Sequence, residues 1–281
     1  MRYWLATLLA IILYNPVLSA ELELSNKVVH ICDDGAEWPP FTYYERENGV
    51  KTSILIGYSV DIIREIFNKH NVEFDLKIVP WKRCQVEVEH GKRYQMFLSG
   101  VFSAERNKKY HVTQIYYYTK HHYFWSLKKY PKGLTLRQDT LSHTLFDLVN
   151  KYDMGSIHGY GLGTFEANGI DTNRIDSSSP NYQSLEKKLM SGRIDVFHES
   201  LEVLDGLAKI GDTMITKNPE IGHAPIPGMS PRGFHMMISK KYVDGLLLKN
   251  LIMSEIEIMK TNGRLDDLWE KYFDSPSVLT N

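Results

Sequence analysis

Arg106, Trp38 and Trp81 are the residues best suited to bind a small solute. A guanidinium keeps its charge at physiological pH, and its planar fork fits a carboxylate. An indole face can pack against a carbon skeleton and attract an ammonium. The alternatives are an exposed Arg106 paired with Glu105, and tryptophans that only fill the core. Taken one at a time, these residues fit the alternatives better, and only together with the motifs around them do they favour recognition of a small anionic or zwitterionic solute.

Two serines flank the turn that leads to Arg106. The hydroxyl groups of Ser99 and Ser103, together with nearby backbone N–H groups, could complete the hydrogen bonds of a carboxylate. Serines are also common in loops that bind nothing. Trp38 precedes two prolines in a loop, and Trp81 follows a strand, where ligands bind in open α/β sheets.

No pattern indicates a metal, a cofactor or a recognisable catalytic triad. Neighbouring strand residues point to opposite faces, so His121 and His122 cannot easily share an ion, and we interpret them as solvated or hinge histidines. Cys32 and Cys84 have no histidine at metal-ligand spacing. The glycines at 159–163 lack the rest of a dinucleotide fingerprint. We therefore expect no metal, no cofactor and no catalytic residue.

The first 20 residues have the layout of a secretory signal peptide. Arg2 supplies the positive start, Trp4–Leu13 is a short apolar run, and Val17–Ala20 supplies small residues. The run is too short for a retained membrane helix. We expect cleavage after Ser19 or Ala20 and localisation in the periplasm.

The bulk composition is that of an ordinary globular protein. Charged residues make up 24% and hydrophobic residues 43%, and the net charge is −1. This balance gives no electrostatic reason to expect a nucleic-acid partner. About 260 residues remain after the leader, enough for one or two domains.

Strands and helices alternate along the chain, which predicts an α/β fold with a parallel sheet. The order helix, glycine, strand occurs at 86–98 and again at 185–197, which indicates two similar lobes. We predict strands at 28–32, 74–79, 94–98 and 234–239, and helices at 58–67, 81–89, 242–261 and 265–272.

Two passages could connect the lobes. An aromatic, strand-like stretch spans 115–127, and prolines and a glycine interrupt 225–231. We expect one lobe of residues 21–120 plus 232–281 and another of 121–231. Two crossings form a hinge, and the cleft between the lobes is the expected ligand site.

The pairing of Cys32 with Cys84 stays open. Export permits a disulfide, and the first cysteine ends a predicted strand while the second begins a predicted helix. A bridge needs Cα atoms within about 7 Å, which the sequence does not show. Two buried free thiols are the alternative.

Several segments, in this order and spacing, resemble the solute-binding proteins of bacterial uptake systems, family 3, typified by polar amino acid receptors. They are Glu37–Phe41, Gly57–Asp61, Pro80–Arg83, Ser99–Arg106 and the ending at 262–273. The resemblance extends from Val28 to Asp274. It implies a type II periplasmic-binding-protein fold of two lobes that captures a solute.

The resemblance also implies roles for single residues. Arg106 would grip a ligand α-carboxylate, with Ser103 in a place that often holds threonine, whereas Val101 stands where a hydroxyl residue is frequent. Trp38 and Trp81 would form aromatic walls.

The second lobe departs from the family in two places. The usual acid that binds a ligand ammonium is replaced by Ser200, and Glu199 stands one position earlier. Either Glu199 or Glu37 would take this role, or no acid does, or Glu199 only favours a helix N-terminus. Tyr160 replaces a small hydroxyl residue and would narrow the pocket.

The expected function is therefore capture of a small carboxylate-bearing ligand, a polar amino acid or a similar zwitterion, for uptake. The expected partner is a membrane ABC permease, and the protein is expected to be monomeric. One alternative is presentation of the ligand to a membrane sensor. Another is an exported dehydratase-like enzyme on the same scaffold, with Glu199, Glu37 and His198 as candidate acids or bases.

Overall fold

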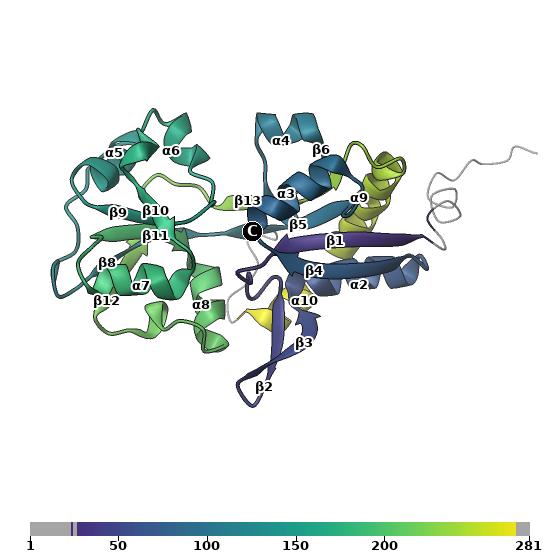
Figure 1. The fold of residues 1–281 in the computed structure, drawn as a ribbon, viewed down its shortest axis with the longest axis horizontal. Helices are drawn as coiled ribbons and strands as arrows, with labels where there is room; N and C mark the ends of the chain where they lie inside the picture. Colours follow the sequence, from purple (N-terminus) through teal and green to yellow (C-terminus); the bar gives the residue numbers. More distant parts are fainter. Residues whose placement is uncertain (1–23, 25–26, 274–281) are drawn as a thin grey trace, which may run out of the picture.

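The computed structural model describes residue 24 and residues 27–273. The predicted leader, residues 1–20, lies outside the described residues. Two lobes lie side by side in Figure 1, each built around its own sheet. The first lobe holds a six-stranded sheet and the second a five-stranded sheet. The predicted α/β fold of two lobes is confirmed.

The first lobe contains a mixed sheet. Its strands are β1 (Val28–Asp34), β4 (Glu73–Val79), β5 (Met96–Val101), β6 (Tyr110–Val112), β7 (Tyr117–Thr119) and β13 (Arg232–Ser239). The order is β4-β1-β5-β13-β6, with β7 also paired to β13. β1 is parallel to β4 and β5, but β13 is antiparallel to β5, β6 and β7. The expectation of a parallel sheet is wrong for β13, because that strand returns from the second lobe in the opposite direction.

Helices cover both faces of this sheet. They are α2 (Tyr58–Lys69), α3 (Trp81–His90), α4 (Ala104–Lys109), α9 (Gly245–Thr261) and α10 (Arg264–Tyr272). Alternate strand residues point to opposite faces. Met96 and Leu98 of β5 join the core shared with α2, α9 and α10, whereas Phe97 joins a smaller cluster with Cys84 and Val88 of α3. The sheet thus fixes α3, and the tryptophan at its start, on one face.

A disulfide attaches α3 to β1. Cys32 and Cys84 are bonded, with their Cα atoms 5.7 Å apart. Both side chains are fully buried. The alternative of two free thiols is therefore excluded.

The second lobe has the same layered construction. Its strands are β8 (His121–Ser126), β9 (Met154–Ile157), β10 (Asp176–Ser179), β11 (Val196–Ser200) and β12 (Ile221–Pro225), in the order β10-β9-β11-β8-β12. Figure 1 shows α5 (Leu141–Asn150) and α6 (Gly163–Ala167) on one side, and α7 (Tyr182–Met190) and α8 (Leu201–Lys209) on the other. Two short 3-10 turns, η1 (Thr172–Arg174) and η2 (Ile215–Lys217), complete this lobe.

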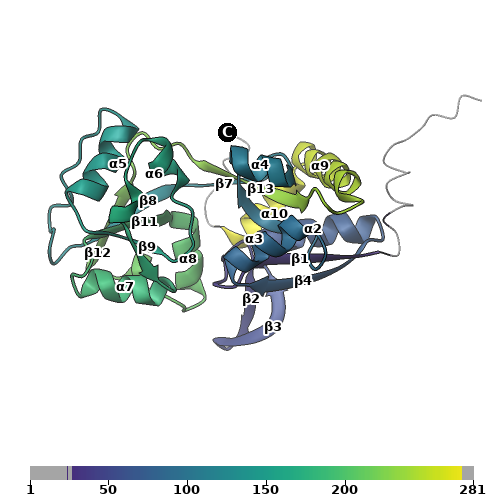
Figure 2. The ribbon, with the colours of Figure 1, turned by 45° about the horizontal axis from the view of Figure 1, so that its top comes forward.

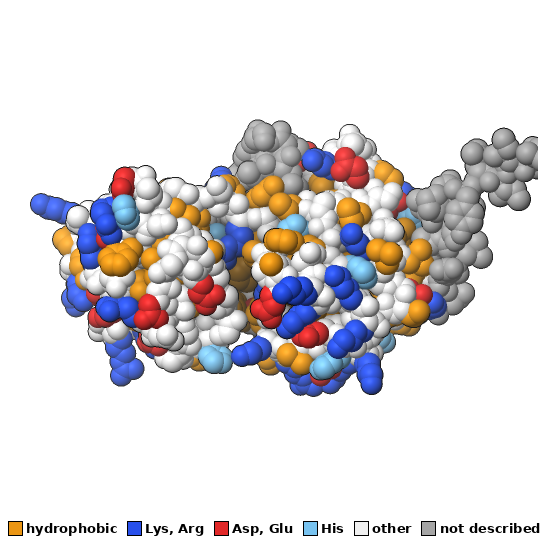
Figure 3. Space-filling view, turned by 90° about the horizontal axis from the view of Figure 1, so that it is seen from above, with side chains coloured by type: hydrophobic (Ala, Val, Ile, Leu, Met, Phe, Trp, Pro, Cys, Tyr) orange, Lys and Arg blue, Asp and Glu red, His pale blue; other side chains and the backbone are white. Residues whose placement is uncertain are grey.

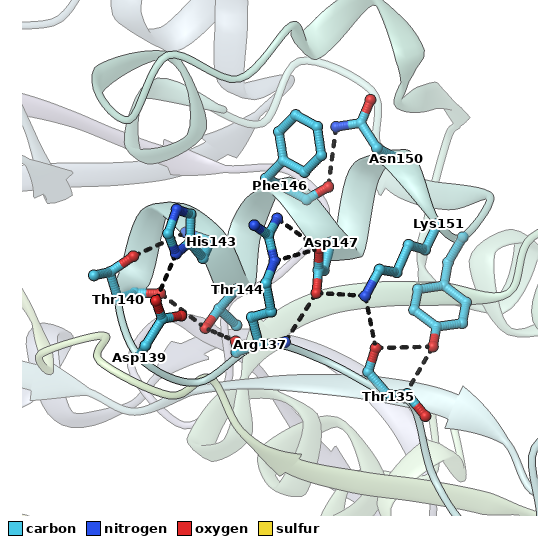
Figure 4. A network of polar contacts seen from close by, with 11 residues as sticks. Thr135, Arg137, Asp139, Thr140, His143, Thr144, Phe146, Asp147, Asn150 and Lys151 are labelled. Atoms are coloured by element: carbon cyan, nitrogen blue, oxygen red, sulfur yellow. Dashed lines mark hydrogen bonds and ion pairs between the residues drawn. The ribbon is translucent and has the colours of Figure 1, made fainter.

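A buried carboxylate holds α5 to the segment that precedes it (Figure 4). The side chain of Asp147 is 1% exposed and accepts hydrogen bonds from Arg137 and from Lys151 Nζ, the latter at 2.7 Å. Burial raises the pKa of Asp147, but these bonds outweigh it and lower the pKa overall. The helix begins at a Thr140 cap that accepts from the His143 N–H. This network stabilises the second lobe, and none of its residues lines the cavity between the lobes.

The chain passes between the sheets twice. Lys120 separates β7 of the first sheet from β8 of the second, and residues 226–231 connect β12 back to β13. The stretch predicted as one crossing, 115–127, therefore belongs to two strands of different sheets. At the first crossing, Ser200 Oγ donates a hydrogen bond to Thr119 Oγ1 at 2.7 Å. Figure 2 shows both crossing segments from another side.

A hairpin of β2 (Tyr43–Glu47) and β3 (Val50–Ile56) extends from the first lobe and was not expected (Figure 1). Its turn contains Asn48 at φ 51° and Gly49 at φ 79°. An Asn-Gly pair favours such turns, so the sequence did carry the signal. Among the described residues, no helix combines the length and apolarity needed to cross a membrane.

Candidate ligand-binding site

A cavity of about 780 Å³ lies between the two lobes. Figure 3 shows the molecule hollowed there, with basic and hydrophobic side chains at the walls. The lining includes the carboxyl ends of β1, β5, β9 and β11 and the beginnings of β8 and β13, the edge where open α/β sheets bind ligands. The loop and helix at 159–168 and the turn at 102–106 supply much of the rest. Seven of the predicted residues line it: Trp38, Trp81, Ser99, Ser103, Arg106, Tyr160 and Glu199.

Arg106 lies in the first-lobe wall. Its guanidinium donates to the Val101 carbonyl at 2.8 Å and to Gln85 Oε1 at 3.1 Å, and lies 5.8 Å from the centre of the Trp81 ring. The alternative of an ion pair with Glu105 is not seen, because Glu105 pairs with Lys109 instead. Both hydrogen-bond partners are neutral, so the positive charge is positioned without being neutralised.

The two serines have structural partners. Ser103 caps α4, with its Oγ accepting from the Arg106 backbone N–H at 3.1 Å. Ser99 Oγ donates to Asp33 Oδ2 at 3.3 Å. Asp33 also accepts from Thr42 Oγ1, and burial raises its pKa to about 7. The serines therefore fix a buried acid and the turn that carries Arg106, and both residues line the cavity.

Aromatic side chains form an apolar wall. The Trp38 ring lies 5.9 Å from Tyr160 of the second lobe and 6.1 Å from Phe234 of β13. Tyr160 in turn is near Asp34, and its hydroxyl helps to offset the rise that burial causes in the Asp34 pKa. Contact between Trp38 and Tyr160 brings the lobes together at this end of the cavity.

Glu199 is a buried acid at the end of β11. Its Oε2 accepts from the Tyr182 hydroxyl at 2.9 Å, and its Oε1 accepts from the Ser200 N–H at 2.7 Å. Burial raises the pKa of Glu199 to about 7, and these hydrogen bonds only partly oppose the shift. The carboxyl group can therefore exchange a proton near neutral pH.

Glu37 does not line the cavity. Its carboxylate accepts from Arg46 at 3.0 Å and from Lys51 at 2.6 Å, both of the β2–β3 hairpin. Burial raises the pKa of Glu37, but the two basic partners outweigh this and lower it. Of the two acids expected to bind an ammonium, only Glu199 lies where a ligand could reach it.

Of the further lining residues, the sequence had singled out His198 as a candidate acid or base, but not Arg232. Arg232 begins β13 and donates to Thr164 Oγ1 of α6 at 2.7 Å. His121 and His198 also line the cavity, with ring centres 5.7 Å apart. Arg232 directly follows the proline-rich return crossing, so its place at the hinge was readable from the sequence. The orientation of its side chain was not.

The adjacent histidines of β8 face opposite ways, as the strand periodicity predicts. His121 faces the cavity, whereas His122 Nδ1 lies 3.0 Å from His223 Nδ1 of β12. Both are buried, so the interpretation as solvated side chains is wrong, because the sheet and its neighbours cover them. Within the described residues, no group of three or more His, Cys, Asp and Glu side chains could hold a metal ion.

Two sheets, two crossings and a cavity between them define a type II periplasmic-binding-protein architecture. The profile of the bacterial extracellular solute-binding proteins, family 3, matches residues 31–275. The chain belongs to this family. No curated protein matches the chain in sequence.

Solved structures share this fold at low sequence identity. An amino acid ABC transporter substrate-binding protein, AbpA of Streptococcus pneumoniae bound to L-arginine, is 19% identical with a TM-score of 0.67, over 91% of this chain and 97% of that one. ArtJ of Geobacillus stearothermophilus, which binds arginine, lysine and histidine, is 15% identical with a TM-score of 0.67, over 91% and 100%. The ancestral amino acid-binding protein AncCDT-1, a precursor of cyclohexadienyl dehydratase, is 16% identical with a TM-score of 0.65, over 92% and 100%.

Proposed function

We propose that this protein is an exported solute-binding protein that captures a small carboxylate-bearing ligand, such as a polar amino acid, between its lobes. The observation that carries the proposal is Arg106, a guanidinium held in the cavity wall by two neutral acceptors. Such a group can bind a ligand carboxylate in bidentate fashion. Trp81 beside it and Trp38 elsewhere in the lining provide apolar surface for the carbon skeleton.

The second lobe supplies an acid for the other end of a zwitterion. Glu199 lines the cavity, and its two oxygens keep lone pairs beyond those used by Tyr182 and Ser200. A ligand ammonium nearby would favour the ionised carboxylate. Family membership supports capture outside the cytoplasm, and we assign ABC-type uptake through a membrane permease on that basis.

A thermal-shift screen of amino acids and other small carboxylates, combined with product analysis, tests the function. We expect at least one zwitterionic ligand to raise Tm in a dose-dependent way and to be recovered unchanged. If no carboxylate-bearing solute stabilises the protein, the proposal is wrong.

Intact-mass analysis of the exported protein should also show loss of 19 or 20 residues, and a species that still begins at Met1 would refute export with cleavage.

Ligand capture should close the lobes about Lys120 and residues 226–231. In this structure the lobes touch with Trp38 against Tyr160 and Pro39 close to Gly206 of α8, and one buried apolar cluster includes residues of both lobes. We propose the lobe boundaries 21–120 plus 232–281 and 121–231 for this motion. Small-angle scattering should give a smaller radius of gyration at saturating ligand. An unchanged radius would count against closure.

Catalysis in the same cavity is a second candidate function, favoured by one observation. Burial raises the pKa of Glu199 to about 7, which suits a general acid or base at neutral pH. A dehydratase would use such a group to move a proton on a bound substrate. The product analysis described above separates the two functions, because a binding protein returns its ligand unchanged.

A further inference from the structure

Two guanidinium groups line the cavity, and neither forms an ion pair with an acid in the described part of the chain. Arg106 donates to Val101 and Gln85, and Arg232 donates to Thr164 Oγ1. Across residues 27–273, neither guanidinium forms an ion pair with a carboxylate. Each has five N–H donors, so each keeps donors available for a ligand. A partly buried cation without a counterion favours binding of an anion.

The two guanidinium groups are held separately. Arg106 is fixed within the first lobe, next to the Trp81 ring, whereas Arg232 reaches to Thr164 of the second lobe. Burial lowers the pKa of Arg232. The charge of Glu199 opposes this shift and the charge of Arg106 adds to it, so the two cations affect each other within one cavity. They share no hydrogen-bond partner among the described residues, so each guanidinium is oriented by its own neighbours.

The surroundings of Arg232 add uncharged donors. Both ring nitrogens of His121 are buried without a hydrogen-bond partner in the described part of the chain, and so is Nδ1 of His198. Burial, reinforced by the charge of Arg232, lowers the pKa of His198 to about 3, and His121 is lowered well below its usual value for similar reasons. Both rings are therefore neutral at physiological pH, and each offers one N–H donor.

Glu199 is the acid whose charge most affects the pKa of Arg232, yet it does not form an ion pair with that guanidinium in the described part of the chain. Glu199 forms hydrogen bonds with Tyr182 and Ser200, and no ion pair joins it to Arg232 among the described residues. Its raised pKa leaves it partly protonated near pH 7. Arg232 thus remains available to a ligand anion, and Glu199 to a ligand ammonium.

We propose that Arg232 and His121 form a second anion subsite in the cavity, distinct from that of Arg106, so that the preferred ligand carries two anionic groups. This inference rests on the proposed function and names its substrate class, a dicarboxylic amino acid. One carboxylate would bind Arg106 and the other Arg232, with the ammonium near Glu199.

Paired ligands of equal size test the subsite. Calorimetric titration of the purified full chain would compare L-glutamate with L-glutamine and L-aspartate with L-asparagine. We expect one acidic member to bind at least about 100-fold more tightly than its amide, since the amide leaves a buried guanidinium without its partner.

Variants then locate the preference. Arg232→Gln should remove most of the acid-over-amide ratio, and Arg232→Lys should restore part of it by keeping the charge. Arg106→Gln should weaken both members of a pair alike. Arg83→Gln is the matched control, because Arg83 is about half exposed on α3, pairs with Glu87 and does not line the cavity. Melting curves confirm that each variant is folded.

The outcomes separate the two proposals. Equal affinity for acid and amide, or an unchanged ratio in a folded Arg232→Gln variant, would overturn the second subsite while leaving solute binding intact. Binding of glutarate together with no binding of any amino acid would support two anion subsites but overturn the amino acid assignment. If no carboxylate binds at all, both proposals fail.

Discussion

The two walls of the cavity recognise charge in different ways. On the first-lobe wall, Arg106 carries a fixed charge that neutral acceptors hold beside Trp81. On the second-lobe wall, Glu199 is an acid whose pKa burial raises to about 7, supported by Tyr182. The first wall therefore offers a permanent cation beside two buried acids, Asp33 and Asp34, whereas the second offers the acid Glu199 and its charge depends on pH and on the ligand. From this difference we expect the carboxylate end of the proposed ligand to contribute more to affinity than its ammonium end.

Glu37 and Glu199 show how position decides the behaviour of one side-chain type. Both are buried, at 7% and 6% exposure. Arg46 and Lys51 lower the pKa of Glu37, whereas Glu199 forms no such ion pair among the described residues and its pKa rises. Burial alone therefore does not set the charge of these acids, and the presence of basic partners does.

The largest expected effect is at the first wall. Arg106→Ala should weaken binding of the identified ligand by about two to four orders of magnitude, because an unpaired carboxylate in a closed cavity costs about 3–5 kcal/mol. Arg106→Lys should also bind poorly, since an ammonium lacks the planar fork. Calorimetric titration measures both. Affinity of Arg106→Ala within about threefold of the parent would place the carboxylate elsewhere.

The second prediction concerns the frame of the first wall. Replacing Cys32 and Cys84 together by alanine should lower the free energy of unfolding by about 2–4 kcal/mol, because the disulfide closes a loop between residues 52 positions apart. Denaturant unfolding measures this loss. Affinity measured well below Tm should stay within about threefold, since neither sulfur lines the cavity. Unchanged stability would show that the bridge adds nothing to the buried packing.

The third prediction uses pH to separate the two acids. The folded-state pKa of Glu199 is raised from 4.5 to about 7, so its contribution to stability is present below about pH 4.5 and is lost as pH rises through 7. Glu199→Gln should therefore gain about 2–3 kcal/mol relative to the parent between about pH 5 and about pH 8.

Glu37 should behave in the opposite way. Its lowered pKa means that its contribution is present above the unfolded value and is lost as pH falls through the folded value. Glu37→Gln should therefore be destabilised at neutral pH and approach the parent in acid. Parallel unfolding curves at several pH values test both variants. If the two respond to pH in the same direction, the contrast between these acids is wrong.

The smallest expected effect concerns the ligand ammonium. Glu199→Gln should weaken binding of a zwitterion by about tenfold, through loss of one charge-assisted hydrogen bond. Glu37→Gln should leave affinity within about threefold, because its carboxylate lies outside the cavity. Titration of both variants with the same ligand provides the comparison. A larger loss at Glu37 than at Glu199 would reverse the assignment of the two acids.

The sequence predicted most regular elements of the first lobe, because their periodicity is local. Strands at 28–32 and 74–79 and helices at 58–67 and 81–89 were found with small shifts at their ends. The strand predicted at 94–98 lies at Met96–Val101. The β2–β3 hairpin was missed although its Asn-Gly turn is a local signal. In these regions, the apolar spacing and the turn residues carry enough information without any tertiary contact.

By itself, the sequence determined the α/β class, two lobes, and a first wall whose motif residues lie close together in the chain. Only the tertiary structure decided which buried charges remain unpaired. The hairpin pairs Arg46 and Lys51 with Glu37, and the two cysteines form a disulfide. Arg232 lines the cavity together with His121 and His198. These outcomes depend on contacts between residues far apart in the chain. Charge and solvation are set by such neighbours and not by residue type, which is why the second wall could not be derived from spacing alone.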